Sequence, residues 1–406
     1  MRPIQGGGQP EETMAKRKKK QRSSGKFKQA LWQVLRQGIR AALQVSMFRV
    51  FDPHSYRRHP QMALADSGKG VQKQGLRVLL GQLVDAVIPR LIVLPVLFLL
   101  FVGVIFYSTL CPARVPLQTF PEALRLYYEK VQFFSEDGTE LHAWFIPSLS
   151  ADDVVEDGDQ ALKRQKPGVV LCHGLGASRD QLLALAGYLN ANDFEVLLFD
   201  FRACGLSGGE TRSLGLRERN DVLAAVHYLA DRSSVDKSRI AVVGQDIGGA
   251  AALGAAARDH SIDAVVVGDI DADLHTAIDR RLAGLGVLRE VSVSAYLAAY
   301  KGYFHTSDRQ VSSAQMAESL DQQQGLLVLT RKGVADLAES AKLVAKYSHA
   351  RTVSAELPSS KHPSLTDPQA GAIIVDFLEN CWNVPAEPVC GKDESASTEQ
   401  RMSEDH

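Results

Sequence analysis

The stretch that decides the fold is IAVVGQDIGGAAAL, residues 240–253. An apolar run leads into a turn rich in glycine, and small residues that suit a closely packed helix follow the turn. This order predicts a buried strand, a sharp turn and a helix, because glycine tolerates the close backbone approach that such a turn needs. At the apex stands Asp246, with Gly244 and Gly248 on either side. The turn therefore presents a carboxylate at the end of a strand.

The five residues 244–248 have the spacing of the motif G-x-S-x-G. In that motif a strained turn lifts one side chain above a sheet and places backbone N–H groups beside it. The motif usually presents a serine hydroxyl, which needs a base before it can attack a carbon atom. A carboxylate is already ionised near neutral pH. Asp246 is therefore a candidate nucleophile that forms an ester with its substrate.

Short apolar runs recur on both sides of this stretch, and helical segments separate them. Such runs predict a mostly parallel central sheet with helices on both faces, because strands of this kind are buried on both sides. The runs are residues 168–172, 194–201, 240–244, 262–269, 325–330 and 352–357. Before them, residues 129–147 predict two strands joined at Asp137-Gly138, a dipeptide typical of tight hairpin turns.

Five motifs follow one another in a set order along the chain. They are EDGTELHAWFIP, LCHGLGAS, FDFRACGLSGGE, GQDIGG and SSKHPSL. With these motifs the chain resembles the α/β-hydrolase fold over roughly residues 125–382, and within that fold the membrane-anchored, serine aminopeptidase-like branch, with an aspartate in place of the nucleophilic serine. Residues 274–322 interrupt the alternation of strands and helices, which predicts a helical lid insertion.

The resemblance implies roles for several residues. The residue after His173-Gly174 typically lends a backbone N–H to the oxyanion hole, so Leu175 inherits that role with Ile247 as its partner. His362 stands at the position of the fold's catalytic histidine, after the last strand. His173 itself is expected to be structural, and the loop 200–207 to be architecture, although Ala203 stands where the family usually has glycine.

The acid that would orient His362 is the least defined part of the pattern. In this branch an aspartate follows the strand GLLVLT, yet direct alignment places Val334 there. Asp336 is the first choice if the turn is remodelled. In haloalkane dehalogenases and epoxide hydrolases the acid can follow the preceding strand, where this chain offers Asp269, Asp271 and Asp273.

An aspartate at the elbow resembles the dehalogenases and epoxide hydrolases, whose carboxylate forms an ester that a histidine-activated water then hydrolyses. Dehalogenases usually carry a tryptophan after the nucleophile, whereas this chain has Ile247. Epoxide hydrolases present cap tyrosines to the epoxide oxygen, and the insertion holds Tyr296, Tyr300 and Tyr303 on one predicted helical face. Packing is the competing role for these rings.

The sequence thus predicts a hydrolase of a small ester, amide, epoxide or halide, acting through Asp246 and His362. The alternative is a catalytically inactive protein of the same fold that serves binding or scaffolding at the membrane. A third, minor possibility is a lipid- or nucleic-acid-interaction protein, for which membrane lipids are the expected partner and nucleic acid is not. No phosphate loop, dinucleotide signature or metal-ligand cluster stands out, so no cofactor and no metal are expected.

Charge and hydropathy predict a membrane anchor. Residues 91–110, LIVLPVLFLLFVGVIFYSTL, carry no charge, and this length matches a helix that crosses a hydrocarbon core roughly 30 Å thick. Residues 1–90 hold 18 Lys or Arg against 5 Asp or Glu, and residues 91–406 hold 28 against 42. The positive-inside rule therefore predicts a single-pass protein with a cytoplasmic N-terminus and an extracytoplasmic C-terminal domain.

The predicted organisation has four parts. Residues 1–90 are a basic head with an amphipathic helix near residues 27–47, 91–110 the membrane helix, 125–382 the α/β-hydrolase domain, and 383–406 a disordered acidic tail. The polar stretch 151–168 is expected to be a surface loop. The five cysteines are odd in number and lack framework spacing, so Cys172 and Cys204 are expected to be buried thiols.

Overall fold

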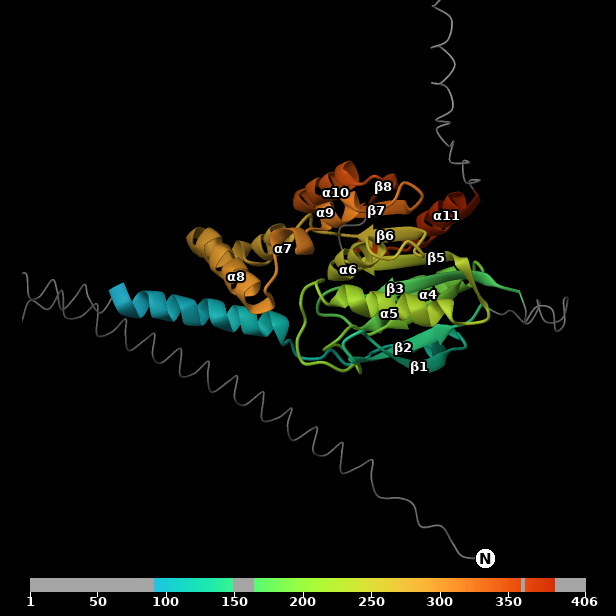
Figure 1. The fold of residues 1–406 in the computed structure, drawn as a ribbon, viewed down its shortest axis with the longest axis horizontal. Helices are drawn as coiled ribbons and strands as arrows, with labels where there is room; N and C mark the ends of the chain where they lie inside the picture. The colour runs from blue at the N-terminus through green and yellow to red at the C-terminus, as the bar shows by residue number, and fades with distance from the viewer. Residues whose placement is uncertain (1–90, 149–163, 359–361, 384–406) are drawn as a thin grey trace, which may run out of the picture. The chain divides into compact units, whose positions relative to one another are not determined.

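The structure is a computed structural model that describes residues 91–148, 164–358 and 362–383 (Figure 1). The predicted basic head with its amphipathic helix, most of the predicted loop 151–168 and the acidic tail lie outside the described residues. The chain divides into two units, residues 1–98 and 99–406, and the second unit contains the complete sheet.

Eight strands form one sheet in the order β1-β2-β4-β3-β5-β6-β7-β8. The first two strands form the predicted antiparallel hairpin, and β2 pairs antiparallel with β4. All the other pairs are parallel, as the apolar runs predicted. The strands are β1 Glu129–Phe134, β2 Glu140–Ile146, β3 Lys166–Cys172, β4 Glu195–Phe199, β5 Val235–Gln245, β6 Ala264–Gly268, β7 Gly325–Arg331 and β8 Arg351–Leu357.

Most strand boundaries lie within two residues of the prediction, including β3, which begins at Lys166 inside the predicted loop 151–168, and the largest difference is at the start of β5. β5 begins at Val235 rather than at Ile240, because Val235 already pairs with Lys166 before the register shifts between Pro167 and Gly168. The polar residues at the start of the strand hide this extension from a reading based on hydrophobic runs.

Helices cover both faces of the sheet, as expected for a parallel sheet (Figure 1). The longer helices are α4 Leu183–Asn190, α5 Glu218–Ala230, α6 Ile247–Ala256, α7 Leu274–Arg281, α8 Arg289–Phe304, α9 Ser313–Glu318, α10 Ala335–Tyr347 and α11 Ala370–Asn383. Short 3-10 turns are η2 Pro121–Leu124, η4 Arg179–Leu182, η5 Ala283–Leu288, η6 Asp308–Val311 and η7 Ser364–Thr366.

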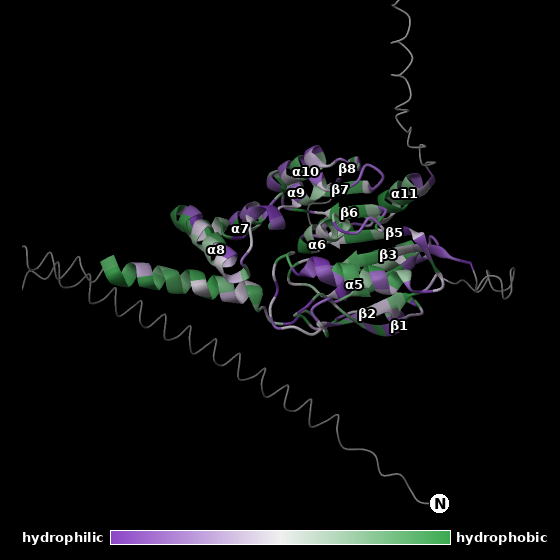
Figure 2. Cartoon of the chain, in the orientation of Figure 1, coloured by the Kyte–Doolittle hydropathy of each residue, from purple (hydrophilic) through white to green (hydrophobic). Residues whose placement is uncertain are grey.

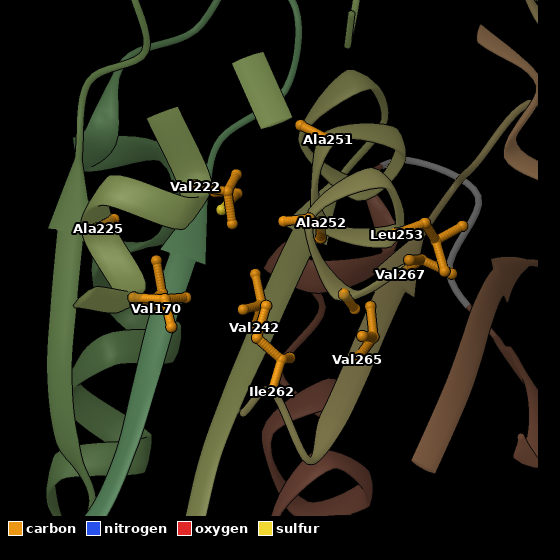
Figure 3. Packing of buried hydrophobic residues seen from close by; sticks show 14 of the residues in the cluster. Val170, Val222, Ala225, Val242, Ala251, Ala252, Leu253, Ile262, Val265 and Val267 are labelled. Atoms are coloured by element: carbon orange, nitrogen blue, oxygen red, sulfur yellow. The ribbon is translucent and has the colours of Figure 1, made fainter. Parts of the chain in front are cut away.

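Successive side chains of a strand point to opposite faces of the sheet, so the molecule has one hydrophobic core on each face. Val170 faces a cluster with residues of α5, α6, α9 and α10, whereas Val169 and Leu171 face a cluster with residues of α4 and α11. Figure 3 shows the first core, in which Ala251 and Ala252 of α6 lie against the sheet. The small side chains let α6 approach β5 and β6 closely, since a Cβ on Gly249 would lie 3.0 Å from the Gly244 carbonyl oxygen.

The predicted insertion is observed as a helical segment between β6 and β7, comprising α7, η5, α8, η6 and α9. In the described part of the chain, one helix is long and apolar enough on its own to cross a membrane. This helix, Leu91–Leu110, has a mean hydropathy of 2.7 and hydrophobic colouring along most of its length (Figure 2), and most of its residues are exposed. The backbone N–H of Arg212 donates to the Leu110 carbonyl at its end.

Candidate active site

The predicted elbow is present where β5 meets α6. Asp246 has φ 53° and ψ −118°, a conformation that costs a residue with a Cβ of the order of 1–3 kcal/mol. At both flanking positions only glycine fits, because neighbouring backbone atoms leave no room for a Cβ. A Cβ on Gly244 would lie 2.3 Å from the Gly248 carbonyl oxygen, and a Cβ on Gly248 would lie 2.5 Å from that of Cys172. Packing of backbone against backbone thus holds Asp246 in its strained conformation.

The two predicted oxyanion-hole residues lie on either side of Asp246. The backbone N–H of Leu175, in the loop after β3, lies near enough to the Asp246 carboxylate to lower the pKa of that group. Ile247 is the first residue of α6, so its N–H belongs to the helix N-terminus, where amides lack helical partners. The amide of Leu175 therefore lies near the side chain that stands in the nucleophile position.

A small pocket, partly open to solvent, lies in front of the elbow. Its polar side chains include Asp246, Asp271, Asp273 and Arg281. The remaining lining is mostly apolar and comes from the elbow, the segment before α5 and the insertion: Leu214, Ile247, Ala250, Leu274, Ala277 and Val311. The pocket thus combines one ionised cluster with apolar walls, as small-molecule sites commonly do.

Two consecutive arginines at the end of α7 supply the positive charge of this cluster. Arg281 Nη2 lies 3.2 Å from Asp246 Oδ2 and 3.3 Å from Oδ1. Arg280 binds both oxygens of Asp271 through one edge of its guanidinium, with Nε 3.0 Å from Oδ1 and Nη2 2.7 Å from Oδ2, and its Nη2 lies 3.9 Å from Asp246 Oδ1. Neither arginine was predicted from the sequence, where the only signal was two consecutive cations within the insertion.

The environment of Asp246 raises its pKa above the ordinary value. Burial is the main cause, and the negative charge of Asp271 adds to it, while Arg281, Arg280 and the Leu175 amide oppose the shift. Because the folded protein binds this proton more tightly than the unfolded chain, the stability that the group contributes is lost as the pH rises through its folded-state pKa. Because Arg281 and Arg280 lower the pKa that burial raises, they favour the ionised form of Asp246 that a nucleophile requires.

His362 lies in the segment between β8 and η7 and is exposed. Within the described residues, its ring makes no hydrogen bond or ion pair. The segment that follows it is nevertheless fastened to the elbow. The Ser364 N–H donates to Asp269 Oδ2 at 2.9 Å, and the Leu365 N–H donates to Gln245 Oε1 at 3.1 Å. The structure thus joins the elbow to the histidine segment, but does not bring Asp246 and His362 into hydrogen-bond contact.

The candidate acids fall into different environments. Asp336 is exposed in the first turn of α10, and Arg289 is a positive charge near it. Asp271 is paired with Arg280, and Asp273 caps α7 by accepting a hydrogen bond from the Thr276 N–H at 2.7 Å.

Asp269 is buried directly after β6. Its Oδ2 accepts from Gln245 and Ser364 and lies 2.9 Å from Arg331 Nε. Its Oδ1 is buried without a hydrogen-bond partner among the described residues. Of the four carboxylates, Asp269 alone is hydrogen-bonded both to the residue preceding the nucleophile and to the segment that carries the histidine.

Several neighbouring residues are engaged in structure. His173 is buried, its Nε2 accepts from the Phe201 N–H at 3.2 Å, and burial lowers its pKa, which favours the neutral ring. The loop 200–207 is architectural, since Asp200 accepts from two backbone amides, and Ala203 adopts a positive φ of 57° there. Cys172 and Cys204 are buried thiols outside any disulfide, and burial raises the pKa of both.

The three tyrosines of α8 do not share one environment. Tyr296 and Tyr300 are buried, Tyr300 donates to the Ser213 carbonyl at 2.5 Å, and Tyr303 is exposed. None of them lines the pocket at Asp246. Their observed contacts are therefore those of packing residues.

Comparison with known proteins supports the fold. The family model described as alpha/beta hydrolase fold matches residues 167–285, from β3 into the insertion. The chain is similar to the uncharacterized protein YfhR of Escherichia coli K12, with 31% identity over 175 residues, which cover 42% of this chain and 58% of that protein. It is also similar to the uncharacterized protein Rv2307c of Mycobacterium tuberculosis, with 32% identity over 124 residues, 30% of this chain and 39% of that protein. The matches thus span less than two thirds of these relatives.

Among solved structures, the chain is similar to the Pyrococcus furiosus esterase Pf2001, with 21% identity and a TM-score of 0.49 over 68% of this chain and 98% of that one. The family match, the order of the strands and the strained elbow between β5 and α6 agree with one another. The chain has the α/β-hydrolase fold.

Proposed function

We propose that the protein is a hydrolase that uses Asp246 as a covalent nucleophile on a small epoxide, halide, ester or amide. The observation that carries this proposal is the strained elbow, which holds the Asp246 carboxylate beside the pocket and near the backbone N–H of Leu175. A carboxylate oxygen that faces this amide would become the carbonyl oxygen of an ester. The other oxygen is then the attacking atom.

The reaction has two balanced steps. The free Asp246 oxygen forms a bond to the substrate carbon, and the bond from that carbon to the leaving group breaks with its electron pair. His362 then takes a proton from water, and the hydroxide attacks the carbonyl carbon of the ester. Negative charge develops on the carbonyl oxygen beside the amides of Leu175 and Ile247, which stabilise it. Collapse breaks the bond from this carbonyl carbon to the substrate oxygen and restores the carboxylate, while His362 gives up its proton to the leaving group or to solvent. The product is an alcohol after an epoxide or halide; with an ester or amide the intermediate is an anhydride and the product is a carboxylic acid.

Asp269 fits the role of the residue that orients His362 better than Asp336 does. Its Oδ1 is buried without a partner among the described residues, and its Oδ2 binds the backbone two residues beyond His362. On this proposal the histidine segment moves so that the ring of His362 reaches that oxygen. The exposed Asp336 has no hydrogen bond to this segment within the described residues.

The test uses one turnover in heavy-oxygen water with an epoxide, halide or ester found active by screening. Attack of water on the ester carbon places the heavy oxygen on the peptide that contains Asp246. His362→Gln should accumulate the ester on that peptide, because the attack step survives and the hydrolysis step loses its base. Turnover that leaves Asp246 unlabelled would exclude the covalent mechanism.

A second candidate is a catalytically inactive protein that descends from the serine branch and serves binding at the membrane. The ion pair between Asp246 and Arg281 favours it, since a carboxylate neutralised by a guanidinium is a weaker nucleophile. On this reading no substrate labels Asp246. Asp246→Ser would create weak esterase activity that depends on His362, because a serine would regain the oxyanion amides of the serine aminopeptidase-like branch.

The proposed location is a membrane to which the helix Leu91–Leu110 anchors the domain, with lipids as the partner and no role for nucleic acid. Its 20 residues and its mean hydropathy of 2.7 support a span. The excess of cations in residues 1–90 supports a cytoplasmic N-terminus. Protease added outside spheroplasts should digest the domain and leave a fragment that contains residues 1–90. Protection of the domain would contradict this orientation.

A further inference from the structure

The segment η5–α8 of the insertion carries an exposed apolar surface at the bend before α8. Val287 is 97% exposed, and Leu288 and Val291 are also exposed. Large apolar side chains gathered in one place on a surface commonly mark an interaction site. In Figure 2 the insertion shows hydrophobic colouring along parts of α8.

Two tyrosine rings of α8 connect this surface to the apolar helix. The ring of Phe106 lies 5.3 Å from that of Tyr296 and 5.8 Å from that of Tyr303. Tyr303 and Tyr107 are both exposed. Amphipathic rings of this kind are typical of the boundary between lipid and water, where the ring is buried and the hydroxyl hydrated. The end of the apolar helix and α8 thus meet where the protein would leave a bilayer.

The insertion is apolar enough to reach lipid but is held at its base. The helical segments Leu274–Arg281 and Ala283–Phe304 are bent by 108° relative to each other and together have the length and hydropathy of a broken span. However, Arg280 and Arg281 at the end of α7 bind Asp271 and Asp246 in the pocket. These contacts keep α7 with the domain, so the bent pair cannot cross a membrane without breaking the cluster.

The charges near the bend are compatible with a shallow position. Arg289 forms an ion pair with Asp279, and Glu290 also acts on it electrostatically. Pairing reduces the penalty for bringing these groups to the headgroup region. Segments of this kind lie with their apolar face about 5–10 Å into the boundary between headgroups and acyl chains.

We propose that the surface formed by Val287, Leu288 and Val291 inserts into the lipid leaflet next to the domain. The proposal rests on the proposed anchoring of the chain by Leu91–Leu110. Docking would attach the helix pair that carries Arg281 to the bilayer and would turn the insertion toward substrates dissolved in lipid.

The test places a photoreactive benzophenone side chain at one position of the full-length protein, reconstituted in vesicles of phosphatidylcholine and phosphatidylglycerol in equal parts. Position 287 is the test. Position 104, exposed on the apolar helix, is the positive control, and position 353, half-exposed on β8, is the negative control. After illumination, mass spectrometry should find lipid adducts at 287 and 104, and at least tenfold less at 353.

The outcomes separate the two proposals. Adducts at 104 without adducts at 287 would overturn lipid docking of the insertion and leave the anchor intact. Absence of lipid adducts at both positions would overturn the anchor, and the docking proposal with it. An adduct at 287 to a second copy of the chain in place of lipid would also overturn lipid docking. The readout requires no turnover, so it does not depend on whether Asp246 is a nucleophile.

Discussion

The elbow and the insertion differ in how they are held. At the elbow, backbone atoms are in contact, and the buried side chains of Gln245 and Asp269 bind backbone amides of the histidine segment or each other. The insertion lines the same site with apolar side chains and supplies its positive charge through the half-buried guanidiniums of Arg280 and Arg281, and it exposes Val287. The scaffold of the site therefore belongs to the sheet, whereas its charge balance depends on an element with far fewer constraints.

The sharpest contrast between the two regions is the effect of adding one methyl group. Gly248→Ala would bring a Cβ within 2.5 Å of the Cys172 carbonyl oxygen, where neither backbone can move freely. We expect the free energy of unfolding to fall by about 3 kcal/mol or more. Gly302→Ala in α8 is the matched control, since nothing lies within 4 Å of its Cβ. It should raise stability by about 0.5–1 kcal/mol, and chemical denaturation measures both. Equal effects of the two substitutions would remove the contrast.

The next prediction separates the buried carboxylate beside the elbow from the exposed one. Asp269→Asn should lower kcat about 100-fold or more, because His362 loses the group that orients it. The ester on Asp246 should accumulate, a readout that a purely structural role would not produce. Asp336→Asn, the matched surface substitution, should change kcat by no more than about twofold. Rapid quenching and mass spectrometry of the Asp246 peptide measure the ester. The reverse ranking of the two variants would make Asp336 the acid.

Arg281 tests how the insertion controls the elbow. Because its charge lowers the pKa of Asp246 against the effect of burial, Arg281→Ala should raise that pKa further. The acid limb of the pH dependence of kcat then moves to higher pH, and kcat at mildly acid pH falls several-fold. Arg281→Lys keeps the charge and should move the limb less. A rate that rises in Arg281→Ala would instead show that the ion pair suppresses the nucleophile.

The smallest expected effect concerns Asp273, which lines the pocket but caps α7. Asp273→Ala should lower the free energy of unfolding by about 1 kcal/mol, because the Thr276 N–H loses its acceptor. Asp273→Asn keeps an acceptor oxygen and should retain both stability and activity. If Asp273→Asn folds normally but loses turnover, Asp273 is a participant in the reaction rather than a helix cap.

Local pattern was sufficient for the strands and the elbow. The six apolar runs predicted β3 to β8, and the segment around Asp137-Gly138 predicted the hairpin of β1 and β2, because burial on both faces and tight turns constrain nearby residues directly. The glycines around Asp246 were informative for the same reason, since each is required by an atom that a Cβ would strike. The early start of β5 was not predicted, because most of the first residues of this strand are polar.

The sequence by itself determined the sheet, the strained position of Asp246 and the apolar run Leu91–Leu110, since each follows from residues close together in the chain. Only the tertiary structure decided which groups meet Asp246. Arg281 lies 35 positions beyond it, and Ser364 lies 95 positions beyond the Asp269 that accepts its N–H. The sequence pattern around a charged residue does not specify which residue will be its partner. That partner depends on how the strands and the insertion converge at one edge of the sheet.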